Sequence, residues 1–81
     1  MNNNSSEKKI AIVTGAGQGI GRAIACRLAR DGFALVIVDI NPAALEKVKK
    51  EIEELGTSVL AITADLTKLD EIQKVIDLSA Q

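Results

Sequence analysis

The sequence predicts an α/β fold in which helices pack against a parallel sheet. From Lys9 onward, short runs of β-branched residues alternate with longer stretches of helical periodicity, which is typical of consecutive βα units. Apolar residues make up 47% of the 81-residue chain, yet Phe33 is its one aromatic residue. An aliphatic core of this kind suits a sheet covered by helices. The length allows one small domain, at residues 9–81, preceded by a polar tail at 1–8 that we expect to be disordered.

The first predicted strand, at residues 10–14, is a continuous apolar run of the kind found in strands buried on both faces. A glycine cluster follows it and leads into a helix that we expect at residues 19–30, where Asp31 and Gly32 supply a stop signal. The apolar side chains of this helix recur at helical spacing and should face the sheet. They are Ile20, Ala23, Ile24 and Leu28.

The second predicted strand, at residues 34–38, ends at Asp39. Asn41 can cap the helix that follows, and Pro42 can occupy the first turn of that helix. Gly56 closes the helix. Its side chains that should face inward are Leu45, Val48, Ile52 and Leu55.

A third strand is expected at residues 58–63 and leads to Asp65. Thr67 can then cap a last helix that continues to the end of the chain. The inward side chains expected for this last helix are Leu69, Ile72, Val75 and Ile76. Three βα units therefore follow one another without a linker or a second domain.

Composition and charge limit the classes of partner. Ten Lys and Arg residues stand against eleven Asp and Glu, for a net charge of −1 without a basic stripe, which argues against a nucleic acid or an anionic membrane as partner. No apolar run is long enough for a membrane span. Cys26 is the one cysteine and histidine is absent, so we expect no disulfide, no Cys/His metal site and a reducing, cytoplasmic setting.

The segment from Thr14 to Gly21 turns from strand to helix through four glycines. Such a turn presents backbone N–H groups and the positive end of the helix dipole to an anion, here a pyrophosphate. Gly15, Gly19 and Gly21 are the candidates for the unusual φ, the bare backbone beside the phosphates and the close helix contact. A P-loop would need a Lys-Ser/Thr pair that is absent. A glycine-rich turn without a ligand is the alternative interpretation.

The same segment reads Thr-Gly-x-x-x-Gly-Ile-Gly, with Gln18 before Gly19 and with Ile20 before Gly21. It resembles the opening motif of the short-chain dehydrogenase/reductase family, and the resemblance covers essentially Lys9 to Gln81. Its residues are similar to those of the diacetyl/acetoin (2,3-butanediol) reductase branch of that family. The resemblance implies a Rossmann-type three-layer αβα domain, of which this chain is the N-terminal part of the doubly wound parallel sheet, with strand order 3-2-1.

Asp39 stands twenty residues after Gly19, at the end of the second predicted strand. There, an acidic side chain can accept hydrogen bonds from both hydroxyls of an adenosine ribose and repel a 2′-phosphate. NADP binding usually needs a compensating cation, yet Ile40 follows Asp39 and Gln18 precedes Gly19. The sequence therefore predicts NAD(H) rather than NADP(H). A solvated turn residue is the alternative interpretation of Asp39.

Asp65 ends the third predicted strand in the same way. The family resemblance implies that its carboxylate accepts a hydrogen bond from the adenine amino group. It also implies that the N–H of Leu66 contacts a ring nitrogen of the adenine. The alternative is an ordinary turn aspartate ahead of the Thr67 cap.

The catalytic residues of the resembled family are missing from this chain. Members transfer hydride with an Asn-Ser-Tyr-Lys set, and the chain contains no tyrosine, so no residue in it is assigned a catalytic role. The resemblance implies a parent enzyme that is NAD-dependent, acts on a small alcohol or ketone such as diacetyl or acetoin, and forms a homo-oligomer, by family resemblance a tetramer. The 81 residues alone are predicted to be inactive, and marginally stable or oligomeric because the first strand would leave an unpaired edge.

Two other functions fit parts of the same pattern. The chain could be a non-catalytic dinucleotide-binding module or remnant. It could also belong to a methyltransferase that binds S-adenosylmethionine, because residues 15–19 satisfy a loose G-x-G-x-G loop. Val13, which stands where that class typically has an acidic residue, and the additional Gly21 argue against the methyltransferase.

Overall fold

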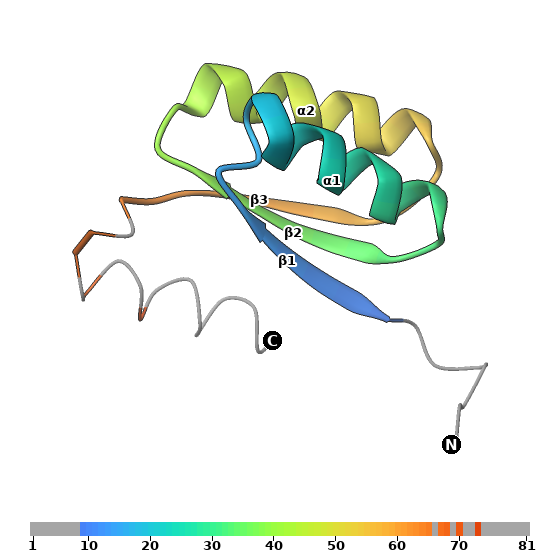
Figure 1. The fold of residues 1–81 in the computed structure, drawn as a ribbon, viewed down its shortest axis with the longest axis horizontal. Coiled ribbons are helices and arrows are strands. Elements are labelled where there is room, and N and C mark those ends of the chain that lie inside the picture. Colours follow the sequence, from blue (N-terminus) through green and yellow to red (C-terminus); the bar gives the residue numbers. More distant parts are fainter. Residues whose placement is uncertain (1–8, 66, 69, 71–72, 74–81) are drawn as a thin grey trace.

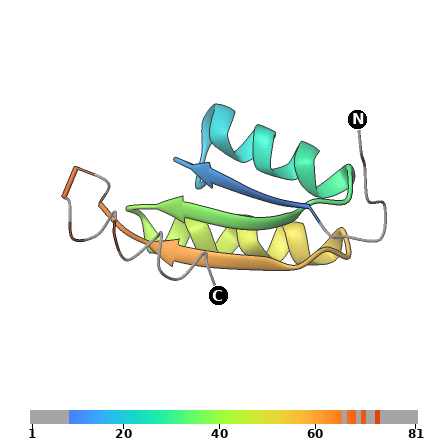
Figure 2. The same cartoon turned by 90° about the horizontal axis from the view of Figure 1, so that it is seen from below.

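A computed structural model describes residues 9–65, 67–68, 70 and 73. The elements follow one another as β1 (Ile10–Thr14), α1 (Gly19–Arg30), β2 (Ala34–Asp39), α2 (Pro42–Glu54) and β3 (Val59–Thr63). Both helices lie on the same face of the sheet (Figures 1 and 2). The tail predicted at 1–8 and the inward set of the predicted last helix lie outside the described residues.

The three strands form one parallel sheet in the order β1-β2-β3. This order confirms the strand order 3-2-1 and the Rossmann-type α/β fold predicted from the sequence. Thr14 pairs with Val38, and Asp39 pairs with Thr63. The carboxyl ends of all three strands are therefore level, and the loops that follow β1, β2 and β3 open at one edge of the sheet.

The helices cover one face of the sheet and leave the other face without a helix in the part of the chain that the structure describes (Figure 2). The core between helices and sheet consists of Val13, Ala16, Ala25, Ala29, Leu35, Ile37, Leu45, Val48 and Ile52. A smaller cluster on the opposite face consists of Val36, Val38, Ile62 and Ala64. Residues 35–38 of β2 are thus buried on both faces, as a central parallel strand requires.

Strand β1 departs from the burial expected on both faces. Val13 points into the helix-side core, but Ile10 and Ile12 expose 63% and 52% of their surface. The reason is position, because β1 is an edge strand of the described sheet and the helices lie on its other face. A continuous apolar run does not reveal how many of its faces are covered.

The predicted sheet-facing side of α1 is also wrong. Ile20 and Ile24 expose 78% and 48% of their surface and Ala23 is exposed, whereas Leu28 packs at the margin of the core. The residues that α1 buries are Ala25 and Ala29. Together with Gly21 they form a row of small residues at spacing four, which lets the helix approach closely. A Cβ on Gly21 would lie 2.7 Å from the carbonyl carbon of Gly15, so the smallest row, and not the bulkiest, must face inward.

Helix α2 begins as predicted. The Asn41 Oδ1 accepts hydrogen bonds from the N–H groups of Ala43 and Ala44 at 3.0 and 3.1 Å, and Pro42 occupies the first turn. Of the predicted inward residues, Leu45, Val48 and Ile52 are buried. Leu55 is the exception, since it lies at the C-cap and exposes 42% of its surface.

Candidate functional site

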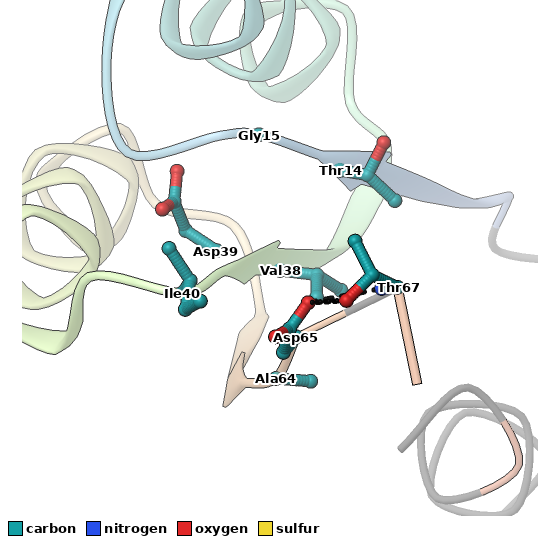
Figure 3. A pocket seen from close by; sticks show the side chains of 8 residues that line it. All are labelled: Thr14, Gly15, Val38, Asp39, Ile40, Ala64, Asp65 and Thr67. Atoms are coloured by element: carbon teal, nitrogen blue, oxygen red, sulfur yellow. Dashed lines mark hydrogen bonds between the residues drawn. The ribbon is translucent and has the colours of Figure 1, made fainter. Parts of the chain in front are cut away.

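A pocket of about 400 Å³ lies at the carboxyl edge of the sheet. Its lining comes from the ends of all three strands and the turns after them (Figure 3). The lining residues are Thr14, Gly15, Val38, Asp39, Ile40, Ala64, Asp65 and Thr67. The structure thus brings Gly15, Asp39, Ile40 and Asp65 of the predicted site together, whereas Leu66 lies outside the described residues.

The turn between β1 and α1 has the backbone conformation that the glycine pattern predicts. Gly15 and Gly19 adopt φ of +64° and +61°, in the left-handed region that favours glycine. The buried Ala16 ties the turn to the neighbouring strand, because its N–H donates to the carbonyl oxygen of Val38 at 3.1 Å. The turn therefore sits directly above the end of β2.

The N-terminus of α1 is available to an anion. Gln18 occupies the N-cap in an extended conformation and its side chain makes no capping hydrogen bond. Gln18, Gly19 and Ile20 are all exposed. The first backbone N–H groups of a helix and the positive end of its dipole suit a phosphate. These three residues and Gly21 follow the lining residue Gly15 in the chain, but none of the four is among the lining residues.

The carboxylate of Asp39 is held by backbone donors from two different turns. Its Oδ2 accepts from the N–H of Gly17 at 2.8 Å, and its Oδ1 accepts from the N–H of Asn41 at 3.0 Å. Figure 3 shows the half-buried Asp39 pointing toward the turn that follows Gly15. Because two fixed donors act on it, the carboxylate is oriented before any ligand arrives.

Gly17 contacts the candidate site, and the sequence did not predict this contact. It is buried, and its N–H is one of the two donors to Asp39. The signal was present in the sequence, since Gly17 is a glycine at one of the three x positions of the Thr-Gly-x-x-x-Gly motif. What the sequence did not reveal is that this position faces the end of β2.

Asp65 is held locally by Thr67. Its Oδ1 accepts from the Thr67 hydroxyl at 2.6 Å and from the Thr67 N–H at 2.9 Å, as the dashed lines in Figure 3 mark. The hydroxyl and then the N–H hold the pKa of the Asp65 carboxyl below its ordinary value, because both donate to the charged form. The turn that was the alternative interpretation of Asp65 is therefore present, and it places this carboxylate in the pocket lining.

The described part of the site combines acidic side chains with hydrogen-bond donors of the backbone. Its polar groups are two carboxylates, hydroxyls and backbone donors. Among the described residues, no three His, Cys, Asp or Glu side chains gather as a metal site, and no helix is long and apolar enough to cross a membrane. Cys26 is a half-buried free thiol on α1, away from the pocket lining.

A glycine-rich turn after β1, a helix N-terminus beside it and an acidic residue ending β2 define a dinucleotide-binding domain of the Rossmann type. A family model described as short chain dehydrogenase matches residues 9–81. The chain belongs to this family, which confirms the resemblance inferred from the motif and leaves the methyltransferase alternative without support.

The relatives are oxidoreductases. The chain is 42% identical over 71 residues to "Diacetyl reductase [(S)-acetoin forming]" of Staphylococcus epidermidis, covering 88% of this chain and 28% of that protein. The crystal structure of NAD+-bound xylitol dehydrogenase superposes with a TM-score of 0.85 at 37% identity, over 88% of this chain and 27% of that one. An alcohol dehydrogenase from the archaeon Thermococcus sibiricus, complexed with 5-hydroxy-NADP, has the same TM-score at 38% identity, over 90% and 32%. The chain spans between a quarter and a third of these relatives.

Proposed function

We propose that this chain is the nicotinamide-dinucleotide-binding part of a short-chain oxidoreductase and that it prefers NAD(H) to NADP(H). The observation that carries the preference is the Asp39 carboxylate, fixed at the end of β2 in the pocket lining. A carboxylate accepts hydrogen bonds, so it matches the two hydroxyl donors of an unmodified ribose. The neighbouring Ile40 supplies no positive charge.

A 2′-phosphate at the same place would meet an unfavourable charge. Two like unit charges about 4 Å apart repel by roughly 1 kcal/mol in water and roughly 4 kcal/mol near a protein surface. At about 1.4 kcal/mol for each tenfold change in affinity, this favours NAD by a factor between roughly 5 and 1,000. The pocket lining contains no Lys or Arg among the described residues to offset the repulsion.

The pyrophosphate and the adenine of the cofactor would bind at the same edge of the sheet. The pyrophosphate would lie at the N-terminus of α1, where Gly15 and Gly19 turn the backbone and where Gln18, Ile20 and Gly21 begin the helix. The adenine would lie between the ends of β2 and β3, with Ile40 on one side and Asp65 on the other. The bound nicotinamide supplies the hydride chemistry, and the chain's own residues orient the adenosine half.

The test of cofactor preference is the dissociation constant of NAD+ and of NADP+ for the full-length protein that contains this chain. Asp39→Asn keeps the size of the side chain and removes its charge, so it should weaken NAD+ and leave NADP+ unchanged or tighter. Asp65→Asn is the matched control, because the adenine is common to both cofactors and both affinities should change alike. Equal loss of both cofactors in Asp39→Asn would reject the ribose role.

For the whole protein we propose hydride transfer between the nicotinamide and a small alcohol or ketone, in the cytoplasm and as a homo-oligomer, with diacetyl or acetoin as the first substrates to try. The 42% identity to the diacetyl reductase over this segment supports that choice. Oxidation of NADH in the presence of diacetyl, compared with xylulose at equal concentration, tests it. Saturable NAD binding without turnover of any ketone would favour a non-catalytic binding module instead.

A further inference from the structure

Gly17 differs from the other glycines of the same turn. Gly15 and Gly19 adopt positive φ, but Gly17 does not. Space, and not backbone conformation, is what requires glycine at this position. A Cβ built on Gly17 would lie 2.7 Å from Asp39 Oδ2, 3.0 Å from Asp39 Cγ and 3.0 Å from the Cβ of Ala44.

We propose that Gly17 is a positioning residue for Asp39 and thereby sets the selectivity for NAD over NADP. This inference rests on the proposed function. Gly17 acts through the Asp39 carboxylate, because its N–H donates a hydrogen bond to Asp39 Oδ2 with an N–O distance of 2.8 Å. Gly17 is not among the residues that line the pocket, whereas Asp39 is.

The physical basis is the acceptor capacity of a carboxylate. Two oxygens offer about four acceptor positions, and the N–H groups of Gly17 and Asn41 take one on each oxygen. Each oxygen therefore keeps capacity for one ribose hydroxyl. The backbone donors neither titrate nor rotate, so the side-chain entropy that a free aspartate would lose on binding the ribose is already lost in folding.

A methyl group at position 17 would remove this arrangement. It cannot be accommodated by a shift away from Asp39, because Ala44 at the start of α2 stands at 3.0 Å from the same Cβ position. The Asp39 carboxylate would have to leave its position and give up the Gly17 N–H bond. The repulsion of a 2′-phosphate and the acceptance of the ribose hydroxyls would weaken together, which lowers selectivity from both sides.

The experiment is a double-mutant cycle on cofactor binding in the full-length protein. The readout is the selectivity ratio, the dissociation constant of NADP+ divided by that of NAD+, measured by calorimetry for Gly17→Ala, Asp39→Ala and the double variant. Gly17→Ala should lower the ratio by about tenfold, which is about 1.4 kcal/mol. In the Asp39→Ala background the same substitution should leave the ratio unchanged, because the group it displaces is gone.

Gly32→Ala is the matched control for loss of stability. Gly32 has φ of +92° and lies between α1 and β2, away from the pocket lining. Its substitution should destabilise the protein without changing the ratio. Should Gly17→Ala fail to fold, combining it with Ala44→Gly opens the second contact and lets the methyl group move partly away from Asp39. The ratio of this double variant should lie below that of Ala44→Gly alone, but by less than tenfold, and a ratio equal to that of Ala44→Gly would overturn the role of Gly17.

The outcomes separate the two proposals. If Asp39→Ala leaves the ratio unchanged, the proposed NAD preference fails. If Asp39→Ala lowers the ratio but Gly17→Ala weakens both cofactors equally, the preference stands and the role of Gly17 is overturned, since Gly17 would then act on the shared pyrophosphate. A Gly17→Ala effect of the same size in the Asp39→Ala background would also overturn it.

Discussion

Asp39 and Asp65 end neighbouring strands and line the same pocket, yet they are held in different ways. The Gly17 donor of Asp39 is 22 residues away in the sequence and reaches it only when β1, β2 and the turn above them are assembled. The N–H and the hydroxyl of Thr67, two residues further along the chain, both donate to Asp65. The Asp39 carboxylate is therefore oriented by tertiary structure, whereas a local turn contributes two hydrogen bonds to that of Asp65.

Gly21→Ala should disturb the tertiary contacts that orient Asp39, and we expect it to have the largest effect. The added Cβ would press on the carbonyl group of Gly15, so α1 or the turn must move. Overpacking of this kind costs about 1–3 kcal/mol of unfolding free energy, and the displaced turn should also loosen Gly17 from Asp39. Urea denaturation and the dissociation constant of NAD+ measure the two consequences.

Gly19→Ala supplies the comparison for that variant. Gly19 has positive φ but no atom within 4 Å of an added Cβ, so only the backbone penalty applies, about 1–2 kcal/mol. If Gly21→Ala lost no more stability than Gly19→Ala, close packing of α1 against the turn would not be what holds this region together.

Asn41→Ala tests the second turn that holds Asp39 and should have a smaller effect than either glycine variant. The side chain of Asn41 caps α2 through two N–H groups, while its own N–H donates to Asp39. Loss of the cap should cost about 1 kcal/mol of unfolding free energy. Asn41→Ser, which keeps a capping oxygen, should retain most of it. A larger loss of NAD+ affinity in the alanine variant than in the serine variant would link the cap to the position of Asp39.

The sequence predicts this fold more completely than it predicts the site. Periodicity and glycine signals placed α1 at residues 19–30, as observed, and β3 within one residue. They failed on which side of α1 is buried, because that depends on how closely the helix approaches the sheet, and Gly21 and Ala25 allow the approach where Ile24 would not. Asp39 could be predicted because it directly follows a strand in the sequence. The contact of Gly17 with Asp39 could not, because it depends on how closely the turn approaches the end of β2.

Thr67→Val should weaken the local turn that holds Asp65, and we expect a smaller effect. It removes the hydroxyl that donates to Asp65 Oδ1, so the lowered pKa of the Asp65 carboxyl should rise toward its ordinary value. A lowered pKa contributes stability that is present above the pKa of the unfolded chain and lost as pH falls through the folded value. The valine variant should therefore lose part of the stability that is present near neutral pH, and its stability should fall less on acidification.

Carboxyl NMR titration of Asp65 checks that shift, with Thr67→Ser as the control that retains the hydroxyl. The dissociation constant of NAD+ should respond less to Thr67→Val than to Gly21→Ala, because the Thr67 N–H still donates to Asp65. An unchanged Asp65 titration in the valine variant would show that the side chain of Thr67 does not orient this carboxylate.

The Arg22–Glu51 pair sharpens the comparison because it separates sequence distance from burial. It joins α1 to α2 across 29 residues through Nε–Oε1 and Nη2–Oε2 contacts of 2.8 and 2.5 Å. The pair raises the pKa of Arg22 and lowers that of Glu51, chiefly by the side-chain hydrogen bond. The two side chains are 48% and 31% exposed, and water and salt screen such pairs.

Glu51→Gln should therefore shift the urea midpoint at pH 7 less than any variant above. Lowering the pH should remove even that difference, since the stabilisation from a lowered pKa is lost as Glu51 protonates. If Glu51→Gln lost as much stability as Gly21→Ala, sequence distance alone would explain why Asp39 is held more strongly than Asp65. Burial in the turn above β2 would then not explain the difference.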